Sequence, residues 1–244
     1  MLEPLTFSLT ASATRPFSPP LSPHAPADSA TELAFWRIRR RTLAQAQQAL
    51  KNAGDRLLAA ALLLAAAPAM AFIALAIAIA TPGPVFYRSP RIGRHYAPFH
   101  MLKFRTMRVD ADAARDALRA EANLTGELFK LADDPRVTPL GRFLRATSLD
   151  ELPQLVNVLC GDMSLVGPRP LPPDESGLFR APYTLRFQVL PGITGIWQVK
   201  GRSDASFQRL CELELGYLQR WTLWEDIKIL GWTLPAVLLR KGAR

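Results

Sequence analysis

The stretch LLAAALLLAAAPAMAFIALAIAIA, Leu57 to Ala80, is 24 residues long and contains no charged residue. A helix rises about 1.5 Å per residue, so a helix of this length is long enough for the roughly 30 Å hydrocarbon core of a bilayer. Half of the stretch is alanine, which makes insertion into lipid only moderately favourable. Pro68 lies at its midpoint, where the missing N–H removes a helical hydrogen bond and bends the axis. The stretch therefore predicts a bent membrane helix.

Basic residues flank this apolar stretch on both sides. They are Arg37, Arg39, Arg40, Arg41, Lys51 and Arg56 before it, and Arg88, Arg91, Arg94 and Lys103 after it. Positively charged flanks favour the cytoplasmic face of a membrane, and a straight span would place one flank on the opposite face. A re-entrant helix, which enters the membrane, bends at Pro68 and leaves on the same face, satisfies both flanks. A straight span and a buried helix of a soluble protein are the alternatives.

Composition divides the chain of 244 residues into three parts, residues 1–30, 31–80 and 81–244. Residues 1–30 are rich in Pro, Ser and Ala and lack the apolar core of a signal peptide, which predicts a disordered tail. Residues 31–80 contain a basic helical pattern with aromatic residues, followed by the re-entrant helix. Such a basic amphipathic helix often lies flat on a membrane, although a solvated helix leading into the membrane segment is an alternative.

Residues 81–244 alternate between strand and helix patterns. We expect short strands at 85–87, 99–102 and 191–202, and helices at 110–131, 207–220 and 223–239. The last helical pattern contains Trp224 and Trp232, which suit either a membrane interface or core packing. The predicted fold class is a mostly helical α+β protein that is monotopic, with a Pro-bent re-entrant helix and interfacial amphipathic helices.

A second stretch, SLDELPQLVNVLCGDMSLVGPRPL from Ser148 to Leu171, contains an adjacent carboxylate pair, Asp150 and Glu151. Ser148 and Glu151 match the S-x-x-E capping box, which places the pair in the first turn of a helix. Acidic residues there commonly stabilise the helix through its dipole, and this structural role alone would explain them. The functional interpretation is that the ionised carboxylates serve as a nucleophile or as magnesium ligands.

Basic residues that could bind a diphosphate lie near this pair in the sequence. They are Lys103 and Arg105 in KFRTM, Arg142 and Arg145 just before the pair, and Arg169 in GPRP. Arginine suits bidentate recognition of phosphate oxygens, although any one of these residues could be an ordinary surface charge. The sequence contains no P-loop, no G-x-G-x-x-G fingerprint and no G-x-S-x-G elbow.

The net charge of +9 and the pI near 10.1 favour anionic partners: nucleic acid, an anionic lipid surface or a phosphorylated substrate. The apolar helix favours the last two. Cys160 and Cys211 lack metal-ligand spacing, so a zinc site is not expected, and we expect both to be buried thiols in a reducing compartment.

From about Asp55 to Leu239 the chain resembles the bacterial sugar transferase family, the monotopic phosphoglycosyl transferases. The similarity rests on the Pro-interrupted apolar run, PGPVF, RIG, KFRTM, the segment DDPRVTPLGRFLRATSLDELPQLVNVLCGDMSLVGPRPL, and PGITGIWQVKGR. The motifs follow one another in order along most of the chain. The chain lacks the multi-helix N-terminal membrane region of longer members and is similar to the minimal form.

The resemblance implies a reaction at the cytoplasmic face of the bacterial inner membrane, with residues 81–244 as the catalytic domain. A nucleotide diphosphate sugar, expected to be a UDP-sugar, gives its sugar phosphate to polyprenyl phosphate (undecaprenyl phosphate) and releases nucleoside monophosphate. This step would initiate exopolysaccharide or glycoconjugate synthesis. Asp150 would be the nucleophile that forms a covalent phosphosugar intermediate. Glu151 would assist through the metal or by deprotonating the acceptor. Mg²⁺ would neutralise the donor diphosphate, with Asp150 and Glu151 as its protein ligands.

The sequence departs from the family pattern at a few positions. Ala67 occupies the place of a common serine before Pro68, Ser89-Pro90 replaces the glutamine usual after PVFYR, and Glu214 replaces a usual aspartate. Two other classes of function are alternatives to the enzyme. One is a membrane-anchored scaffold or binding protein of the same fold without catalysis. The other is a nucleic-acid-binding protein, which only the charge suggests; we expect no nucleic acid partner.

Overall fold

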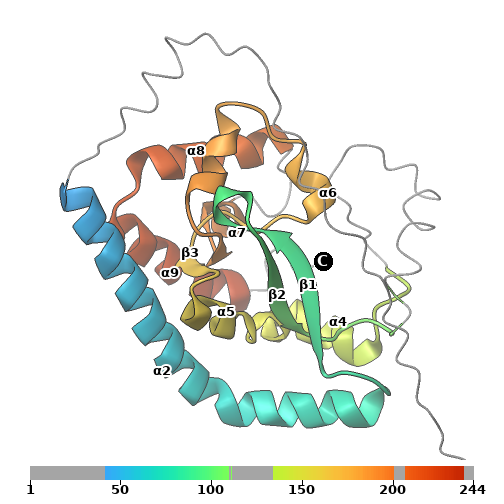
Figure 1. The fold of residues 1–244 in the computed structure, drawn as a ribbon. Helices are drawn as coiled ribbons and strands as arrows, with labels where there is room; N and C mark the ends of the chain where they lie inside the picture. The colour runs from blue at the N-terminus through green and yellow to red at the C-terminus, as the bar shows by residue number, and fades with distance from the viewer. Residues whose placement is uncertain (1–41, 110, 112–133, 201–206, 239–244) are drawn as a thin grey trace, which may run out of the picture. The chain divides into compact units, whose positions relative to one another are not determined.

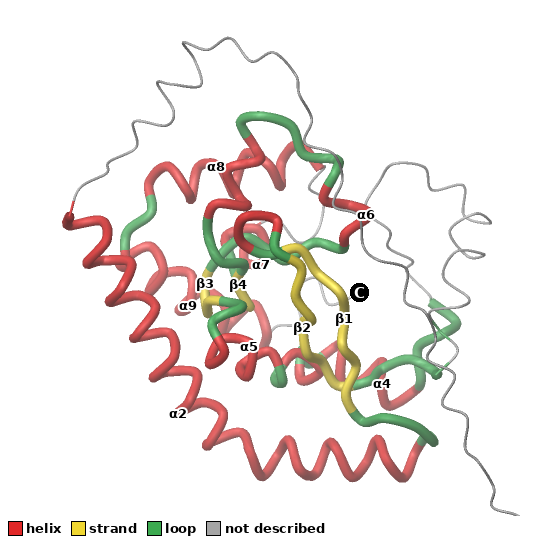
Figure 2. Tube along the Cα trace, in the orientation of Figure 1, coloured by secondary structure: helices red, strands yellow, loops and turns green. Residues whose placement is uncertain are grey.

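The computed structural model of the protein describes residues 42–109, 111, 134–200 and 207–238, all within one compact unit, residues 39–244 (Figure 1). The tail expected over residues 1–30, the first part of the basic helix and nearly all of the helix expected at 110–131 lie outside the described residues. The described part is a mostly helical α+β structure with two small sheets (Figure 2).

The apolar stretch forms the second part of one long helix, α2 (Thr42–Ala80), whose axis bends along its length (Figure 1). Pro68 is the proline inside this helix, and proline is the usual cause of a sharp helix bend. The helix is long and apolar enough to cross a membrane, and only 11% of its most apolar window is buried. Leu64 and Phe72 are 77% and 73% exposed. The alternative of a buried soluble helix is therefore wrong.

The N-terminal part of α2 is attached to the rest of the unit by buried charges. Lys51 Nζ lies 2.6 Å from the Asp226 carboxylate and 3.2 Å from that of Asp55, one turn along the helix. The same Asp55 carboxylate accepts a hydrogen bond of 2.5 Å from Ser164 Oγ. Lys51 and Asp226 are both buried, so the pair stabilises this packing only because each charge has its partner.

An antiparallel hairpin follows α2. Strand β1 (Phe86–Ile92) pairs with β2 (Pro98–Phe104) in the register Phe86 to Phe104, through a turn that includes the 3₁₀ segment η1 (Arg94–Tyr96). Both strands are edges of a two-stranded sheet, which is why Pro90 is tolerated within β1. Phe104 packs with Ile73 and Ile77, so the hairpin contacts the C-terminal half of α2. The strands expected at 85–87 and 99–102 are confirmed and are longer.

The remaining elements follow the hairpin along the chain, and some of them contribute to the main hydrophobic core. They are α4 (Pro139–Ala146), η2 (Leu149–Glu151), α5 (Gln154–Cys160), β3 (Ser164–Val166), α6 (Pro173–Ser176), η3 (Tyr183–Gln188), β4 (Gly192–Thr194), α7 (Ile196–Lys200), α8 (Phe207–Arg220) and α9 (Leu223–Leu238). Strands β3 and β4 are parallel. The core joins Ala59 of α2 to residues of β2, α5, β3 and α9.

Three sequence-based expectations have mixed outcomes here. The strand expected over 191–202 is mostly wrong: of its described residues, 191–200, only Gly192–Thr194 form a strand, because β3 offers just three residues for pairing. Ile196 and Val199 then pack on the core at helical spacing as part of α7. Cys160 is exposed, contrary to expectation, because α5 buries Leu155 and Val158 on its other side. Cys211 is buried, and burial raises the pKa of its thiol to about 11.

The C-terminal helices begin and end almost where the sequence predicts. On α9, Trp224, Ile227 and Leu234 are more than half exposed, at 63%, 55% and 67%. This exposure is compatible with the interfacial role predicted for the helix, which stays a prediction. Trp221 is not available for such a role, because its Nε1 donates to the Asp226 carboxylate at 3.1 Å.

We expect Gly141→Ala to destabilise the protein. A Cβ at Gly141 would lie 2.0 Å from the Thr106 carbonyl oxygen, which also accepts hydrogen bonds from the Thr138 N–H and hydroxyl. This overpacking should cost about 1–3 kcal/mol in the free energy of unfolding. Thermal unfolding of the detergent-solubilised protein measures it. Gly177→Ala is the matched control, since no atom lies within 4 Å of its Cβ position, and equal stability of the two variants would contradict the packing.

Candidate active site

The carboxylate pair lies in the short 3₁₀ segment η2, between α4 and α5, and the predicted capping box is wrong. Ser148 adopts a left-handed conformation (φ 57°) as the chain leaves α4, and its side chain makes no capping hydrogen bond. The Glu151 N–H instead donates to the Ser148 carbonyl at 3.2 Å. Helix α5 begins only at Gln154, so the pair precedes that helix rather than occupying its first turn.

Two cations hold the Glu151 carboxylate. Lys103 Nζ donates to Glu151 Oε1 at 2.8 Å, and Arg169 Nη2 donates to the same oxygen at 3.4 Å. Burial alone would raise the pKa of Glu151, but the charges and hydrogen bonds of Lys103 and Arg169 outweigh it and lower the pKa to about 2. Glu151 is therefore ionised at neutral pH.

Asp150 has a different environment. It is buried, with 7% of its surface exposed, and none of the described residues donates a hydrogen bond to it. Burial raises the pKa of Asp150, against the opposing charges of Lys103, Arg145 and Arg169, while neighbouring Glu151 raises it further. The two adjacent carboxylates thus differ: cations hold Glu151, whereas the lone pairs of Asp150 accept no hydrogen bond from the described part of the chain.

The structure brings together some of the predicted phosphate-binding residues. Lys103 and Arg169 contact the pair, and Arg145 is close enough for its charge to act on Asp150 while its Nε donates to Thr106 Oγ1 at 2.9 Å. Arg105 lies elsewhere: its Nη2 donates to the Thr81 carbonyl oxygen at 2.8 Å, next to the end of α2. Arg142 is exposed on α4. The phosphate-binding roles themselves stay predictions.

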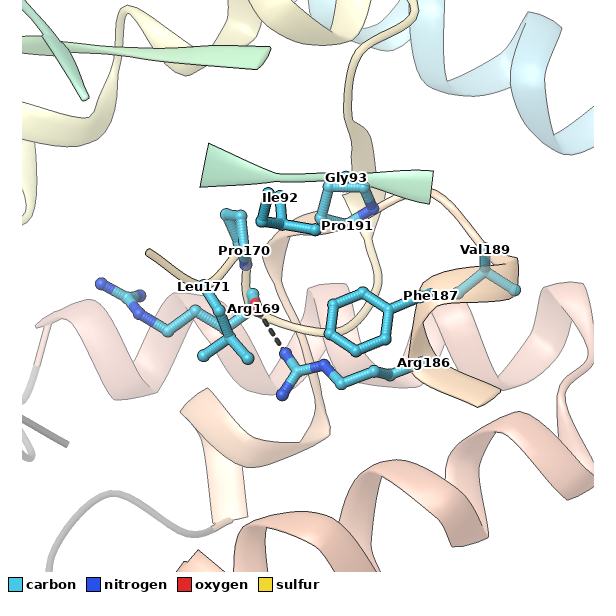
Figure 3. A pocket seen from close by; sticks show the side chains of 9 residues that line it. All are labelled: Ile92, Gly93, Arg169, Pro170, Leu171, Arg186, Phe187, Val189 and Pro191. Carbon is cyan, nitrogen blue, oxygen red and sulfur yellow. Dashed lines mark hydrogen bonds between the residues drawn. The ribbon is translucent and has the colours of Figure 1, made fainter. Parts of the chain in front are cut away.

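A buried ion pair supports the backbone of Arg169. Arg186 Nη1 lies 3.3 Å from Glu214 Oε2, and both side chains are at most 4% exposed. Glu214 accepts a hydrogen bond of 3.3 Å from the Arg169 N–H, and Arg186 donates to the Arg169 carbonyl, while the Arg169 side chain extends away from Arg186 (Figure 3). The pair fixes the residue whose guanidinium reaches Glu151. The cavity beside it is only about 10 Å³, enough for a single water.

Asn157 aligns β2 with α5. Its Oδ1 accepts a hydrogen bond of 2.9 Å from the Leu102 N–H, and its Nδ2 donates to the His100 carbonyl at 2.8 Å. These bonds fix the strand that bears Lys103 against the helix that follows Glu151. Sequence reasoning missed Asn157, Arg186 and the supporting role of Glu214. The available signals were a polar residue within the apolar face of α5 and the unusual glutamate at 214.

The carboxylate pair fits a magnesium ion that also binds substrate phosphate. Magnesium is commonly held by one or two carboxylates together with substrate oxygens and water, rather than by an all-protein cage. Among the described residues no cluster of three or more His, Cys, Asp or Glu side chains occurs. Asp150 and the ionised Glu151 would supply the two carboxylates of such a site, with substrate oxygens and water as the other ligands.

Comparison with known proteins shows the family to which the chain belongs. Residues 46–240 match the family model described as bacterial sugar transferase, so the chain belongs to the bacterial sugar transferase family. Its relatives include an undecaprenyl-phosphate galactose phosphotransferase of Salmonella typhimurium, 39% identical over 87% of this chain and 45% of the relative.

Two further relatives differ in length. A UDP-glucose:undecaprenyl-phosphate glucose-1-phosphate transferase of Escherichia coli is 40% identical over 80% of this chain and 41% of the relative. The exopolysaccharide production protein ExoY of Rhizobium meliloti is 39% identical over 79% of this chain and 87% of the relative. The chain thus spans less than half the length of the Salmonella and Escherichia relatives and most of ExoY.

We expect Lys103→Met to raise the pKa of Asp150. Lys103 is the strongest of the positive charges that oppose the effect of burial on Asp150, so its removal favours the protonated carboxyl. As the pH is lowered, Asp150 should then become protonated at a higher pH than in the unchanged protein. A ¹³C NMR titration of carboxyl-labelled aspartate, assigned with Asp150→Asn, measures the shift. Lys228→Met on α9 is the control, and an unchanged Asp150 titration in Lys103→Met would contradict the assignment.

Proposed function

We propose that the chain transfers a sugar phosphate from a nucleotide diphosphate sugar to polyprenyl phosphate at a membrane surface. The observation that supports this most directly is the contrast within the pair: no described residue donates a hydrogen bond to Asp150, while Lys103 and Arg169 hold Glu151. A nucleophile needs accessible lone pairs, and its neighbour needs a fixed charge. The names of the relatives indicate a UDP-sugar and undecaprenyl phosphate as the substrate class.

In the proposed first step, an oxygen of Asp150 attacks the phosphorus that bears the sugar. The bond from that phosphorus to the bridging oxygen breaks, and nucleoside monophosphate leaves with the electron pair. In the second step, an oxygen of polyprenyl phosphate attacks the same phosphorus and displaces Asp150. Glu151 would assist by helping to hold Mg²⁺ beside the reacting phosphates. Lys103, Arg145 and Arg169 provide positive charge beside the pair for the donor phosphates.

Asp150 and Glu151 are the residues that would hold Mg²⁺. A bound Mg²⁺ would reduce the negative charge of the donor diphosphate and so lower its repulsion of an anionic nucleophile. Asp150 is buried, so its carboxylate is largely shielded from water.

The proposed site of action is the cytoplasmic face of the bacterial inner membrane, with α2 re-entrant. Lys51 and Asp55 lie before the apolar stretch, yet they contact Asp226 and Ser164, which follow it by more than eighty residues. A straight span would place a bilayer core of roughly 30 Å between such partners. These contacts support a helix that returns to the face it entered, and the exposed apolar side chains of α2 support its burial in lipid.

Asp150→Asn should abolish release of nucleoside monophosphate from a panel of nucleotide diphosphate sugars assayed with undecaprenyl phosphate. An amide is a poor nucleophile, so the first step has no substitute. Recovery of the variant in the membrane fraction shows that anchoring is intact, and Asp174→Asn, at an exposed position of α6, is the matched control. Near-normal turnover in Asp150→Asn would exclude the covalent mechanism. Absence of release from every donor by the unchanged protein would favour the alternative of a non-catalytic scaffold.

Single cysteines test the topology of α2. In a Cys160→Ser background, Gln47→Cys and Arg88→Cys place exposed thiols before and after the apolar stretch. We expect both to react with a membrane-impermeant maleimide only after the inner membrane is permeabilised, as Cys160 itself should in the unchanged protein. Labelling of one flank in intact spheroplasts and of the other only after permeabilisation would refute the re-entrant helix.

A further inference from the structure

A second polar cavity lies at the C-terminal end of α5, at the opposite end of this helix from Asp150 and Glu151. Its volume is about 70 Å³. Its polar lining comes from Asn52, Asp55 and Arg56 of α2 and from Arg94 in the hairpin turn, with Val158 and Met163 on its apolar side. The cavity therefore joins the N-terminal part of α2, the hairpin turn and the end of α5.

The charge available in this cavity is positive. The Asp55 carboxylate is already engaged by Lys51 Nζ at 3.2 Å and by Ser164 Oγ at 2.5 Å. The side chains of Arg56 and Arg94, by contrast, form no hydrogen bond or ion pair with any residue in the part of the chain that the structure describes. Two guanidinium groups thus face one cavity without a carboxylate partner, and guanidinium groups bind phosphate oxygens in bidentate fashion.

Residues with positive φ lie next to both arginines. Gly161 ends α5 with φ +87°, and a Cβ there would lie 2.5 Å from Arg56 Nη2, so glycine leaves room for this guanidinium. Arg94 is followed by His95 and Tyr96, which both adopt left-handed conformations with φ of 56° and 60°. Such residues are strained, and they persist where the surroundings fix them. Stacking of Tyr96 on Phe187, with ring centroids 4.3 Å apart, fixes the turn.

The position of Arg56 along α2 indicates the source of the anion. Arg56 is the last charged residue before the apolar stretch, and the next residue, Leu57, is 74% exposed. A basic residue at the boundary of a lipid-exposed helix lies at the level of the phospholipid headgroups. Anionic lipids attract basic residues close to the membrane surface.

We propose that Arg56 and Arg94 bind the phosphate group of an anionic phospholipid in this cavity. A lipid headgroup and free phosphate would both present a phosphate anion to the two arginines. The exposed apolar stretch beside Arg56 favours the lipid. The bound headgroup would connect α2 to the hairpin turn and fix how deeply the helix enters the lipid. The inference requires membrane association but not the proposed catalysis, since neither arginine contacts Asp150 or Glu151.

Native mass spectrometry of the full chain in detergent, with phosphatidylglycerol or phosphatidylcholine added, tests this site. We expect one tightly retained phosphatidylglycerol and no such retention of phosphatidylcholine. The double variant Arg56→Gln/Arg94→Gln should bind phosphatidylglycerol more weakly by about fivefold per arginine, the equivalent of about 1 kcal/mol each. Arg56→Lys/Arg94→Lys is the decisive variant, because it keeps the net charge and loses the bidentate geometry.

Arg220→Lys, at an exposed position at the end of α8, is the matched control and should retain phosphatidylglycerol like the unchanged protein. Thermal unfolding without lipid confirms that each variant is folded. Equal retention by the unchanged protein and the double lysine variant would overturn the site, because general charge attraction would then explain binding. Titration with inorganic phosphate forms the second arm. Phosphate could stabilise the unchanged protein but not the double lysine variant, while no lipid is retained. That result would overturn the lipid as the source of the phosphate.

Discussion

The arrangement of the described unit depends on the ion pairs of the buried Lys51. Its ammonium lies between Asp55 of its own helix and Asp226 of α9, and Asp226 also accepts a hydrogen bond of 2.6 Å from the Tyr217 hydroxyl. Loss of one partner would leave a buried charge without compensation, which is costly. The ion pair therefore favours packing of α2 against α9. This contact directs the N-terminal part of α2 along the unit and leaves the apolar part of the same helix exposed. The membrane-facing surface and the active-site side of the unit are thereby held in one arrangement.

The candidate active site shows how two adjacent residues obtain different chemical environments. Asp150 and Glu151 are adjacent, yet the tight 3₁₀ turn sends their side chains to different surroundings. Glu151 meets Lys103 from the hairpin and Arg169 from the loop after β3, and each of these has its own support, from Asn157 and from the Arg186–Glu214 pair. Such supporting contacts matter because a displacement of about 1 Å in a positioning residue is enough to reduce a rate strongly.

Much of this structure could be predicted from the sequence, and the remainder depends on long-range contacts. The apolar helix, the hairpin, α8 and α9 follow from local periodicity, and the family resemblance is confirmed by the match over residues 46–240. The capping box failed because the conformation of Ser148 is determined by the end of α4 and because Lys103, 48 residues earlier, binds the glutamate. The length of β4 is limited by the three residues of its partner β3, and the periodicity of the sequence does not indicate this pairing. The placement of Arg105 beside Thr81, rather than beside the pair, likewise depends on tertiary packing.

The contact between Lys51 and Asp226 also bears on the order of events during synthesis. Asp226 follows Lys51 by 175 residues, and at translation rates of about 5–20 residues per second it is made roughly 9–35 s later. Helix formation takes about a microsecond, so α2 is complete long before its charged partner exists. Lys51 is therefore still solvated, and the orientation of the nascent helix is not yet fixed, when the helix forms. Closure of the buried ion pair is a late step, and it joins α2 to the rest of the folded unit.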